Sequence, residues 1–302
     1  MFRILLIILL SAGPALGGSR VKAVSKVDPF VFGNIPNGSA NLNNLPNTDI
    51  TGKTVRTRTI NTGIRNLILI TFGQSNCIGV APSAYTPTNG TVLDNFNTQD
   101  GQMYAATDPL LGVGLAAGGT FGPGNIATRV GDILITNNKF DRVILVPICI
   151  GGTVVAFWGT GGALFSNTAA TMARLAQAGI IPGMTGVTFA AIWMQGESDS
   201  GTGQSAYATS FGQVSAALLA TGFDGRIFVN KETWLIGVVN ANVQAAQVAI
   251  PNNSTPGTWA GANADSLTAG SRQSDNTHFN DAGMASLATL IVAAMAASGA
   301  PF

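Results

Sequence analysis

The sequence has few charged residues and no excess of either sign. Charged side chains make up 10% of its 302 residues, against roughly 25% in an ordinary soluble domain. Fifteen basic and 14 acidic side chains leave a formal net charge of +1. A chain without a basic excess has no electrostatic attraction for the phosphates of nucleic acid. We therefore expect no nucleic acid among its partners.

Histidine and cysteine are also scarce, with one histidine, His278, and two cysteines, Cys77 and Cys149. Zinc sites are usually built from three or four such ligands, so we expect no metal and no other cofactor. Two cysteines allow at most one disulfide, which excludes a disulfide-rich scaffold. The two side chains could form that bond or remain buried as small apolar groups. The sequence leaves both alternatives open.

No apolar run is long enough to span a bilayer, which takes about 20 residues. The first segment instead has a basic start at Arg3, an apolar run over residues 4–10 and small residues up to Gly17. This pattern is typical of a secretory signal peptide. We expect residues 1–17 to be removed, the protein to be secreted or periplasmic, and no membrane contact after cleavage.

The remaining chain changes character near residue 67. Residues 18–66 are rich in asparagine, threonine, glycine and proline, which favours turns and extended pieces. We interpret them as an amino-terminal extension, with a plain linker as the alternative, and residues 67–302 as the catalytic domain. In that domain, four apolar runs of the kind found in strands buried on both faces occupy residues 67–72, 142–148, 187–194 and 226–230.

Helix-like stretches alternate with these strands. They cover about residues 124–138, 168–179, 204–221, 240–249 and 281–297. Strand and helix in alternation predict an α/β fold, a three-layer α/β/α sandwich around a central parallel sheet. Ligands of such sheets bind beyond the carboxyl ends of the strands. The polar segments that follow the predicted strands are therefore the candidates for a site.

The first of these segments is Gly73-Gln74-Ser75-Asn76. A serine at a tight strand-to-helix turn presents its hydroxyl at the open edge of the sheet, with backbone N–H groups near it. Ser75 is thus a candidate nucleophile, and its own N–H a candidate donor to an oxyanion. The alternative is that Ser75 merely caps the next helix, since serine often does so.

The only histidine lies near the carboxyl terminus. If a histidine activates Ser75, His278 must be that base, because the chain has no other. Asp275 precedes it by three residues, and on a turn it can reach the other ring nitrogen and orient the imidazole. Asp281 is a second acid nearby, which we expect to be the N-cap of the last helix.

Two further segments follow predicted strands. Gly151-Gly152 after the second strand allows a close backbone approach, so a glycine N–H there could donate to an oxyanion. Gln195 after the third strand offers an amide donor for the same purpose. Glu197 and Asp199 next to it could be a solvated acidic pair, or the paired carboxylates of a glycosidase. A glycosidase would leave Ser75 and His278 without a role.

These segments, in this order, resemble the sialate O-acetylesterase and acetylxylan esterase group of the SGNH (GDSL-like) hydrolase superfamily. The resemblance rests on Gly73-Gln74-Ser75-Asn76, Pro147…Gly151-Gly152-Thr153…Trp158, Trp193…Gln195-Gly196-Glu197-Ser198-Asp199 and Asp275…His278. It spans residues 67 to about 295. Phe121-Gly122-Pro123-Gly124 resembles a further block in which the last residue is usually an acid, and Cys77 stands where the group usually has methionine.

The resemblance implies a division of roles. Ser75 would be the nucleophile, His278 the base and Asp275 its orienting acid. The N–H of Ser75, the N–H of Gly152 and the side chain of Gln195 would form the oxyanion hole, although the choice between Gly151 and Gly152 stays open. The same segments supply the candidates for substrate binding, which are Gln74, Asn76, Gly151, Thr153, Trp158 and Glu197.

The function implied is a secreted serine esterase that removes O-acetyl groups from carbohydrate, of the sialic acid or xylan type, through an acyl-enzyme on Ser75. Its partner would be an acetylated carbohydrate or another small acyl ester, and Trp158 could stack on a sugar ring. A short-chain carboxylesterase or polyester hydrolase on the same triad is one alternative. A non-catalytic carbohydrate-binding or surface protein is another.

Overall fold

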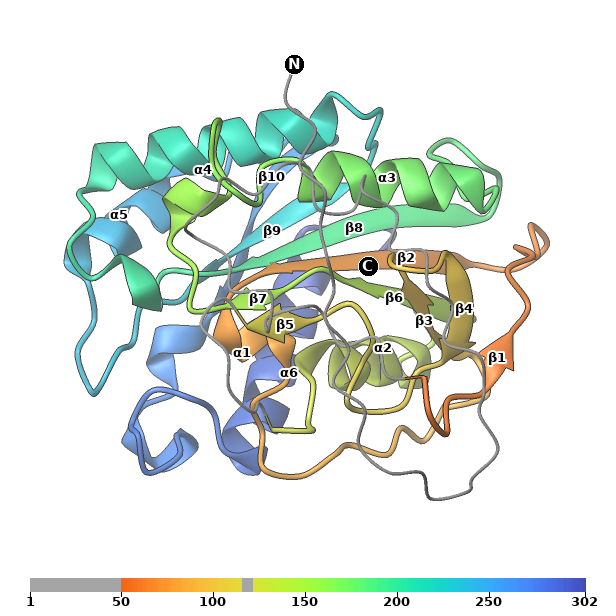
Figure 1. Cartoon of the computed structure of the whole chain (residues 1–302), viewed down its shortest axis with the longest axis horizontal. Coiled ribbons are helices and arrows are strands. Elements are labelled where there is room, and N and C mark those ends of the chain that lie inside the picture. The colour runs from red at the N-terminus through yellow and green to blue at the C-terminus, as the bar shows by residue number, and fades with distance from the viewer. Residues whose placement is uncertain (1–49, 116–121) are drawn as a thin grey trace, which may run out of the picture.

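The computed structural model describes residues 50–115 and 122–302, and the expected signal peptide and Phe121 lie outside the described residues. In the described part of the chain, eight strands form one sheet in the order β1-β4-β3-β6-β2-β8-β9-β10 (Figure 1). They are β1 (Val55–Arg56), β2 (Asn66–Gly73), β3 (Leu93–Asn97), β4 (Gln102–Ala105), β6 (Arg142–Pro147), β8 (Val187–Met194), β9 (Arg226–Lys231) and β10 (Gly257–Asn263). Two short strands, β5 (Gly114–Leu115) and β7 (Ile150–Gly151), pair separately.

The sheet is parallel through six neighbouring strands, from β3 to β10. The predicted central parallel sheet is therefore confirmed, and the four apolar runs correspond to β2, β6, β8 and β9. At one edge, β4 pairs antiparallel with β3 and β1 pairs antiparallel with β4, which the sequence did not predict.

Helices cover both faces of the sheet, as Figure 1 shows. The short α1 (Ser75–Ile78), α2 (Ile126–Thr136) and α6 (Asp281–Ala297) contribute to one hydrophobic cluster, and α3 (Asn167–Gln177), α4 (Gln204–Leu219) and α5 (Ala241–Ala249) to the other. The five predicted helices match α2 to α6 to within two or three residues. The predicted three-layer sandwich is confirmed.

Strand β2 shows how one apolar run supplies both cores. Leu67 and Leu69 are buried in the cluster of α2 and α6, whereas Ile68 and Ile70 are buried in the cluster of α3, α4 and α5. Successive side chains of a strand point to opposite faces. A strand buried on both faces must therefore be apolar at every position.

The chain order places a switch point at β2. This strand pairs with β6 on one side and with β8 on the other. The chain runs from β2 to β3, beyond β6, and later from β6 towards β8, beyond β2, so the connections from the carboxyl ends of these two neighbouring strands run in opposite directions. A crevice opens at such a point in doubly wound sheets, and ligands bind there. Ser75 follows β2 by two residues and lies at this edge.

Part of the predicted extension belongs to the sheet. Within residues 50–66, β1 pairs with β4. The guanidinium of Arg142 on β6 donates to the carbonyl oxygens of Thr57 and Thr59 at 3.1 and 3.0 Å, and it also binds the Asp94 carboxylate at 2.7 Å. This stretch is thus fixed to the domain by backbone pairing and by a buried ion pair.

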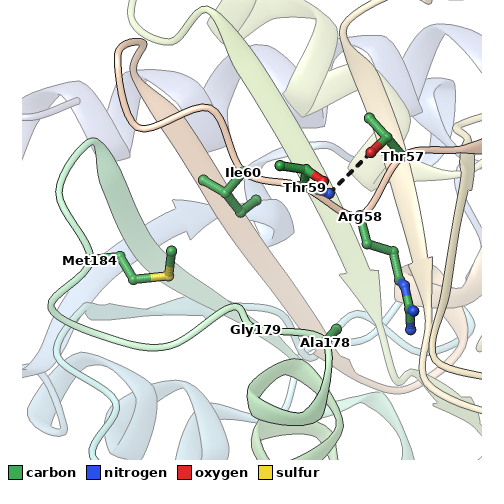
Figure 2. Close-up of a pocket in the computed structure, with 7 residues that line it drawn as sticks. All are labelled: Thr57, Arg58, Thr59, Ile60, Ala178, Gly179 and Met184. Atoms are coloured by element: carbon green, nitrogen blue, oxygen red, sulfur yellow. Dashed lines mark hydrogen bonds between the residues drawn. The ribbon is translucent and has the colours of Figure 1, made fainter.

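A hollow of about 540 Å³ lies under this stretch (Figure 2). It is lined by residues 57–60, Ala178, Gly179 and Met184, which precede β2, follow α3 and precede β8. It therefore lies at the amino ends of the strands and contains none of the predicted site residues. No helix within residues 50–115 and 122–302 has the length and apolar character needed to cross a membrane.

Candidate active site

The turn that carries Ser75 is shaped by Gly73. This glycine has φ +131°, and a Cβ added to it would lie 2.0 Å from the carbonyl oxygen of Met194 at the end of β8. The next residue, Gln74, donates its N–H to the same carbonyl at 2.8 Å. The ends of β2 and β8 therefore approach too closely for any side chain at position 73, and the chain turns directly into α1.

Ser75 is the first residue of α1 and is 9% exposed. The N-cap position belongs to Gln74, and no side chain caps this helix. The capping alternative for Ser75 is therefore not what the structure shows. Its hydroxyl accepts and donates no hydrogen bond among the described residues, and it lies at the carboxyl edge of the sheet.

Asp275 and His278 form the contact that the spacing predicted. Asp275 Oδ2 lies 2.5 Å from His278 Nδ1, and Asp275 Oδ1 accepts from the backbone N–H groups of Thr277 and His278 at 2.9 and 3.0 Å. Burial raises the pKa of Asp275, but these hydrogen bonds outweigh it and lower the pKa below its ordinary value. The carboxyl therefore stays ionised at neutral pH and can orient the ring.

The histidine loop, residues 273–281, lies against the segment that follows Ser75. Phe279 donates its N–H to Asn76 Oδ1 at 3.3 Å, and Gln273 Nε2 donates to the carbonyl of Val80 at 2.6 Å. These bonds join segments about 200 residues apart in the chain. Phe279 is adjacent to His278, and Asn76 is adjacent to Ser75. The bond between Phe279 and Asn76 therefore brings the histidine loop next to the Ser75 turn.

No hydrogen bond joins Ser75 to His278 in the described part of the chain. Catalytic hydrogen bonds are often long or misaligned in a ligand-free enzyme and tighten when substrate binds. The fixed elements are the Asp275–His278 contact and the bond from Phe279 to Asn76. The loop that carries His278 and the turn that carries Ser75 are therefore both held in place without substrate.

The expected role of Asp281 as N-cap of α6 is wrong. Asn280 caps this helix, with its side chain accepting from the N–H of Gly283. Asp281, one residue later, instead accepts from the N–H and the hydroxyl of Ser83 at 3.1 and 2.8 Å. It thereby adds a third tie between the histidine loop and the segment after Ser75.

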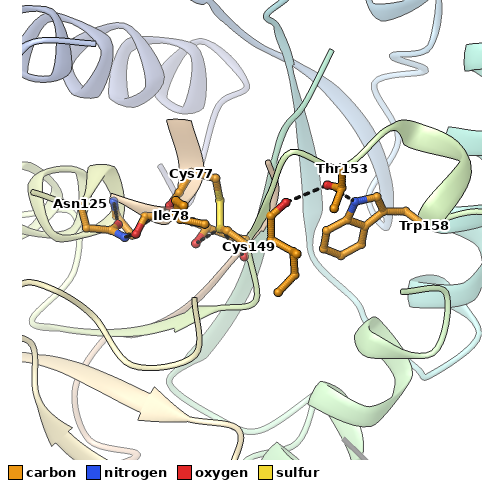
Figure 3. Close-up of a disulfide and its surroundings, with 9 residues drawn as sticks. Cys77, Ile78, Asn125, Cys149, Thr153 and Trp158 are labelled. Atoms are coloured by element: carbon orange, nitrogen blue, oxygen red, sulfur yellow. Dashed lines mark hydrogen bonds between the residues drawn. A yellow bond between two sulfur atoms is a disulfide. The ribbon is translucent and has the colours of Figure 1, made fainter. Parts of the chain in front are cut away.

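Cys77 and Cys149 form a disulfide, which settles the alternatives left open by the sequence (Figure 3). It links Cys77 in α1 to Cys149, which lies two residues after the end of β6. Three residues further on, Gly152 is exposed and has φ +74°, with nothing within 4 Å of an added Cβ. Gly151 is buried and paired with Leu115. The disulfide thus connects the Ser75 turn to the Gly151-Gly152 segment.

Trp158 does not present an exposed ring. It is 1% exposed, and its indole packs edge-on against Trp193 and Phe72, with centroids 5.7 and 6.3 Å apart. Its Nε1 donates to Thr153 Oγ1 at 3.0 Å, and Thr153 in turn donates to the carbonyl of Ile150 (Figure 3). In this structure Trp158 is a core residue that braces the Thr153 loop, so it does not stack on a sugar.

Gln195 lies at the centre of a buried polar network. Its amide nitrogen is within hydrogen-bonding distance of Gln74 Oε1 at 3.2 Å, of the Thr153 carbonyl at 3.1 Å, and of Asp199 Oδ2. Asp199 also accepts the N–H of Val155 at 2.9 Å. Because an amide has two hydrogens, Gln195 must release one of these acceptors before it can donate to an oxyanion.

Glu197 is buried beneath the site. It is 1% exposed and accepts a hydrogen bond of 2.6 Å from Asn76 Nδ2. Two charged residues that sequence reasoning missed, Glu232 and Arg272, are buried close to it. Glu232 directly follows β9, so the same strand-end rule that selected the other candidates applies to it. No comparable signal marks Arg272.

Comparisons with known proteins agree with this architecture. The family model described as "Carbohydrate esterase, sialic acid-specific acetylesterase" matches residues 65–297. Among solved structures, a protein from Arabidopsis thaliana is 18% identical with a TM-score of 0.57, the alignment covering 77% of this chain and 98% of that one. NanS is 16% identical with a TM-score of 0.51, covering 77% and 97%.

Identities this low show a shared fold and no more. A search of curated proteins found no match to the sequence. The family model, however, spans well over half of the chain and includes all the segments on which the resemblance was based. The chain therefore belongs to the carbohydrate esterase, sialic acid-specific acetylesterase family, and it is a carboxylic ester hydrolase.

Proposed function

We propose that the protein is a secreted serine esterase that removes O-acetyl groups from carbohydrate, through an acyl-enzyme on Ser75. One observation carries the proposal. The Asp275–His278 pair and the Ser75 turn, far apart in sequence, are joined at the carboxyl edge of the sheet by the hydrogen bond from Phe279 to Asn76.

The proposed reaction has two halves. His278, held at Nδ1 by Asp275, removes the Ser75 proton through its other ring nitrogen, and Ser75 Oγ attacks the ester carbonyl. The tetrahedral intermediate collapses as His278 gives the proton to the leaving sugar hydroxyl. Water then attacks the acyl-enzyme with His278 again as base, and acetate leaves.

The proposed oxyanion hole consists of the N–H groups of Ser75 and Gly152 and the Gln195 amide. The exposure and positive φ of Gly152 support it over the buried Gly151 as the glycine donor. Loss of one such donor typically costs about 10²–10³ in turnover. Among the candidates for substrate binding, Gln74 lies next to Ser75, with its Oε1 accepting from the N–H of Ser198 at 3.1 Å.

Two features support the finer assignments. The family description names sialic acid-specific acetylesterases, which supports an acetylated acidic sugar as substrate. The amino-terminal pattern over residues 1–17 and the Cys77–Cys149 disulfide support export, because disulfides persist in oxidising compartments.

A short-chain carboxylesterase is the second candidate, and one observation favours it. The segment after β9 exposes Ile236, Val238 and Val239 at 71%, 68% and 38%. Ile236 donates its N–H to Thr277 Oγ1 at 2.9 Å, so these apolar side chains lie beside the histidine loop. An apolar acyl chain could bind them, whereas a hydrated sugar would not.

A substrate panel separates the two candidates. Acetate release from O-acetylated sialic acid and acetyl xylan would be compared with hydrolysis of p-nitrophenyl esters of increasing acyl length. The proposal predicts the highest kcat/KM on an acetylated sugar and a fall with each added methylene. A kcat/KM that rises with acyl length would favour the carboxylesterase. Binding of acetylated sugar without any hydrolysis would refute both.

A further inference from the structure

The chain contains only two glutamates, Glu197 and Glu232, and the fold buries both together. They are 1% and 0% exposed. Glu197 begins a short turn of helix after β8, and Glu232 directly follows β9. The two carboxyls are close enough for the charge of Glu232 to raise the pKa of Glu197.

Three of the four carboxyl oxygens have no donor in good hydrogen-bond geometry, although the amides of Asn76 and Asn230 lie close enough to Glu232 to lower its pKa. Glu197 Oε1 accepts from Asn76, but Glu197 Oε2 and both oxygens of Glu232 accept no hydrogen bond of good geometry from a described residue. Leaving buried polar atoms unpaired is costly. A proton on one carboxyl converts an acceptor into a donor, which can then pair with an oxygen of the other carboxyl.

The energetics favour retention of that proton. Burial, together with the charge of Glu232, raises the pKa of Glu197 well above its ordinary value. Burial also raises the pKa of Glu232, to about 7, against the opposing effect of the Arg272 charge. Two neighbouring carboxyls in a low-dielectric site cannot both ionise readily.

The pair is connected to the histidine loop by two routes. Asn76, held by Glu197, accepts the N–H of Phe279 at 3.3 Å. Arg272 donates to the carbonyl of Thr277 at 2.7 Å, and its guanidinium lies 3.7 Å from the centre of the Phe279 ring. Asn76 and Arg272 bind the residues on either side of His278, and both also interact with the two glutamates.

The other titratable groups around the pair limit what its charge can do. They are Asp199 and Tyr207 on the side of α4, Asp265 from the short helix after β10, Arg272 just before the histidine loop and Asp275 within that loop. Arg272 is the one cation among them. When Glu197 and Glu232 hold one proton between them, the pair has a single negative charge, which attracts the Arg272 guanidinium.

We propose that Glu197 and Glu232 share one proton at neutral pH and that this singly protonated pair positions Ser75 and His278 through Asn76 and Arg272. Its effect on turnover rests on the proposed function, whereas the shared proton does not. When the last proton leaves to solvent at alkaline pH, two buried negative charges repel each other and attract Arg272. Arg272 is then drawn from the Thr277 carbonyl, and the histidine loop shifts.

Because the chain has no other glutamate, protein labelled with ¹³C at the glutamate side-chain carboxyl gives two NMR signals that belong to the pair. The proposal predicts that one carboxyl remains protonated at pH 7 and loses its proton only at alkaline pH. Ordinary titration of both carboxyls near their usual pKa of about 4.3 would overturn it.

The positioning role has its own readouts. His278 is the only histidine, so in protein carrying a histidine-free tag its ring signals are assigned without ambiguity. They should show a second step at the pH where the pair loses its last proton, and kcat on p-nitrophenyl acetate should fall tenfold or more through the same step. A glutamate step without any response of the His278 ring would overturn the positioning role.

Glu232→Gln is the matched variant. Its amide can donate to Glu197, and the pair can then carry no more than one negative charge at any pH. We expect kcat within about threefold of wild type at pH 7 and the alkaline step absent from both kcat and the His278 ring. An unchanged alkaline step would contradict the proposal. If no ester is hydrolysed at all, the proposed function fails, while both NMR readings still decide this inference.

Discussion

At the scale of the residue, the sequence was most informative where chemistry demands a rare side chain. A single histidine left one candidate for the base, and a spacing of three residues predicted that Asp275 contacts its ring. The structure confirms that contact, at 2.5 Å. Exposure could not be predicted in the same way. Trp158 follows a strand end like the other candidates, but a cluster of aromatic rings takes it into the core.

Asp275→Asn tests whether catalysis needs the negative charge of the Asp275 side chain and not only its shape. The amide keeps the size of the side chain but favours the wrong tautomer of His278, so we expect kcat on p-nitrophenyl acetate to fall by about 10²–10⁴. Asp281→Asn is the matched control, because Asp281 binds Ser83 and not His278. Equal kcat values for the two variants would argue against a Ser75–His278–Asp275 triad.

The pH dependence of kcat/KM gives a second test of this carboxylate. The pKa of Asp275 is lowered in the folded protein, so its support of His278 is present above the unfolded pKa of about 3.9 and is lost only as the pH falls below it. The acid limb of the profile should therefore contain no step from Asp275 at or above about pH 4. A second acid step in the wild-type profile that disappears in Asp275→Asn would contradict the lowered pKa of this carboxylate.

At the scale of the element, prediction succeeded for strands whose sequence matches their burial. Residues 67–72 are apolar at every position because both faces of β2 are covered. Strand β3, with the sequence LDNFN, is equally buried but carries polar side chains that pair internally, Asp94 with Arg142 and Asn95 with the N–H of Leu111. Such pairs are formed by tertiary contacts, so local sequence could not reveal the strand.

Gly73→Ala tests the close approach of β2 and β8. The added Cβ would lie 2.0 Å from the Met194 carbonyl, at a φ that favours glycine, so we expect a loss of at least about 2 kcal/mol in the free energy of unfolding. Gly212→Ala within α4 is the control, because nothing lies within 4 Å of its added Cβ. That change should stabilise the helix by roughly 0.5–1 kcal/mol. Denaturant unfolding measures both, and similar values would refute the steric account.

The Cys77–Cys149 disulfide closes a separation of 72 residues. Its removal in the double variant Cys77→Ala/Cys149→Ala should lower the free energy of unfolding by about 2–4 kcal/mol. Because the bond ties α1 to the segment before Gly152, kcat should fall as well. Wild-type stability and kcat in the double variant would show that the bond supports neither.

At the scale of the whole molecule, we expect the dependence of stability on pH to come in part from charges that the fold places in its interior. The pKa values of Glu197 and Glu232 are raised in the folded state, so the native protein holds protons that the unfolded chain releases above about pH 4.3. Their contribution is therefore fully present below that pH and is lost as the pH rises through the folded values. Asp94 and Asp108, whose pKa values burial also raises, act in the same direction, whereas the lowered pKa values of Asp132, Asp141 and Asp275 act in the opposite one.

We accordingly expect the midpoint of thermal unfolding to fall between about pH 5 and pH 8 in the wild-type protein, and to fall less in Glu232→Gln. Thermal scans across this range at constant ionic strength measure the difference. Parallel curves for the two proteins would show that the glutamate pair does not control stability.

The central claim is that Ser75 is the nucleophile of an ester hydrolase, and covalent labelling tests it most directly. The protein would be treated with a serine-directed fluorophosphonate, and the modified peptide identified by mass spectrometry in wild type, Ser75→Ala and His278→Ala. We predict one adduct, on Ser75, with labelling abolished in Ser75→Ala, at least about 10²-fold slower in His278→Ala, and lost in parallel with hydrolysis of p-nitrophenyl acetate. An adduct on another serine, or hydrolysis that persists in Ser75→Ala, would contradict the claim.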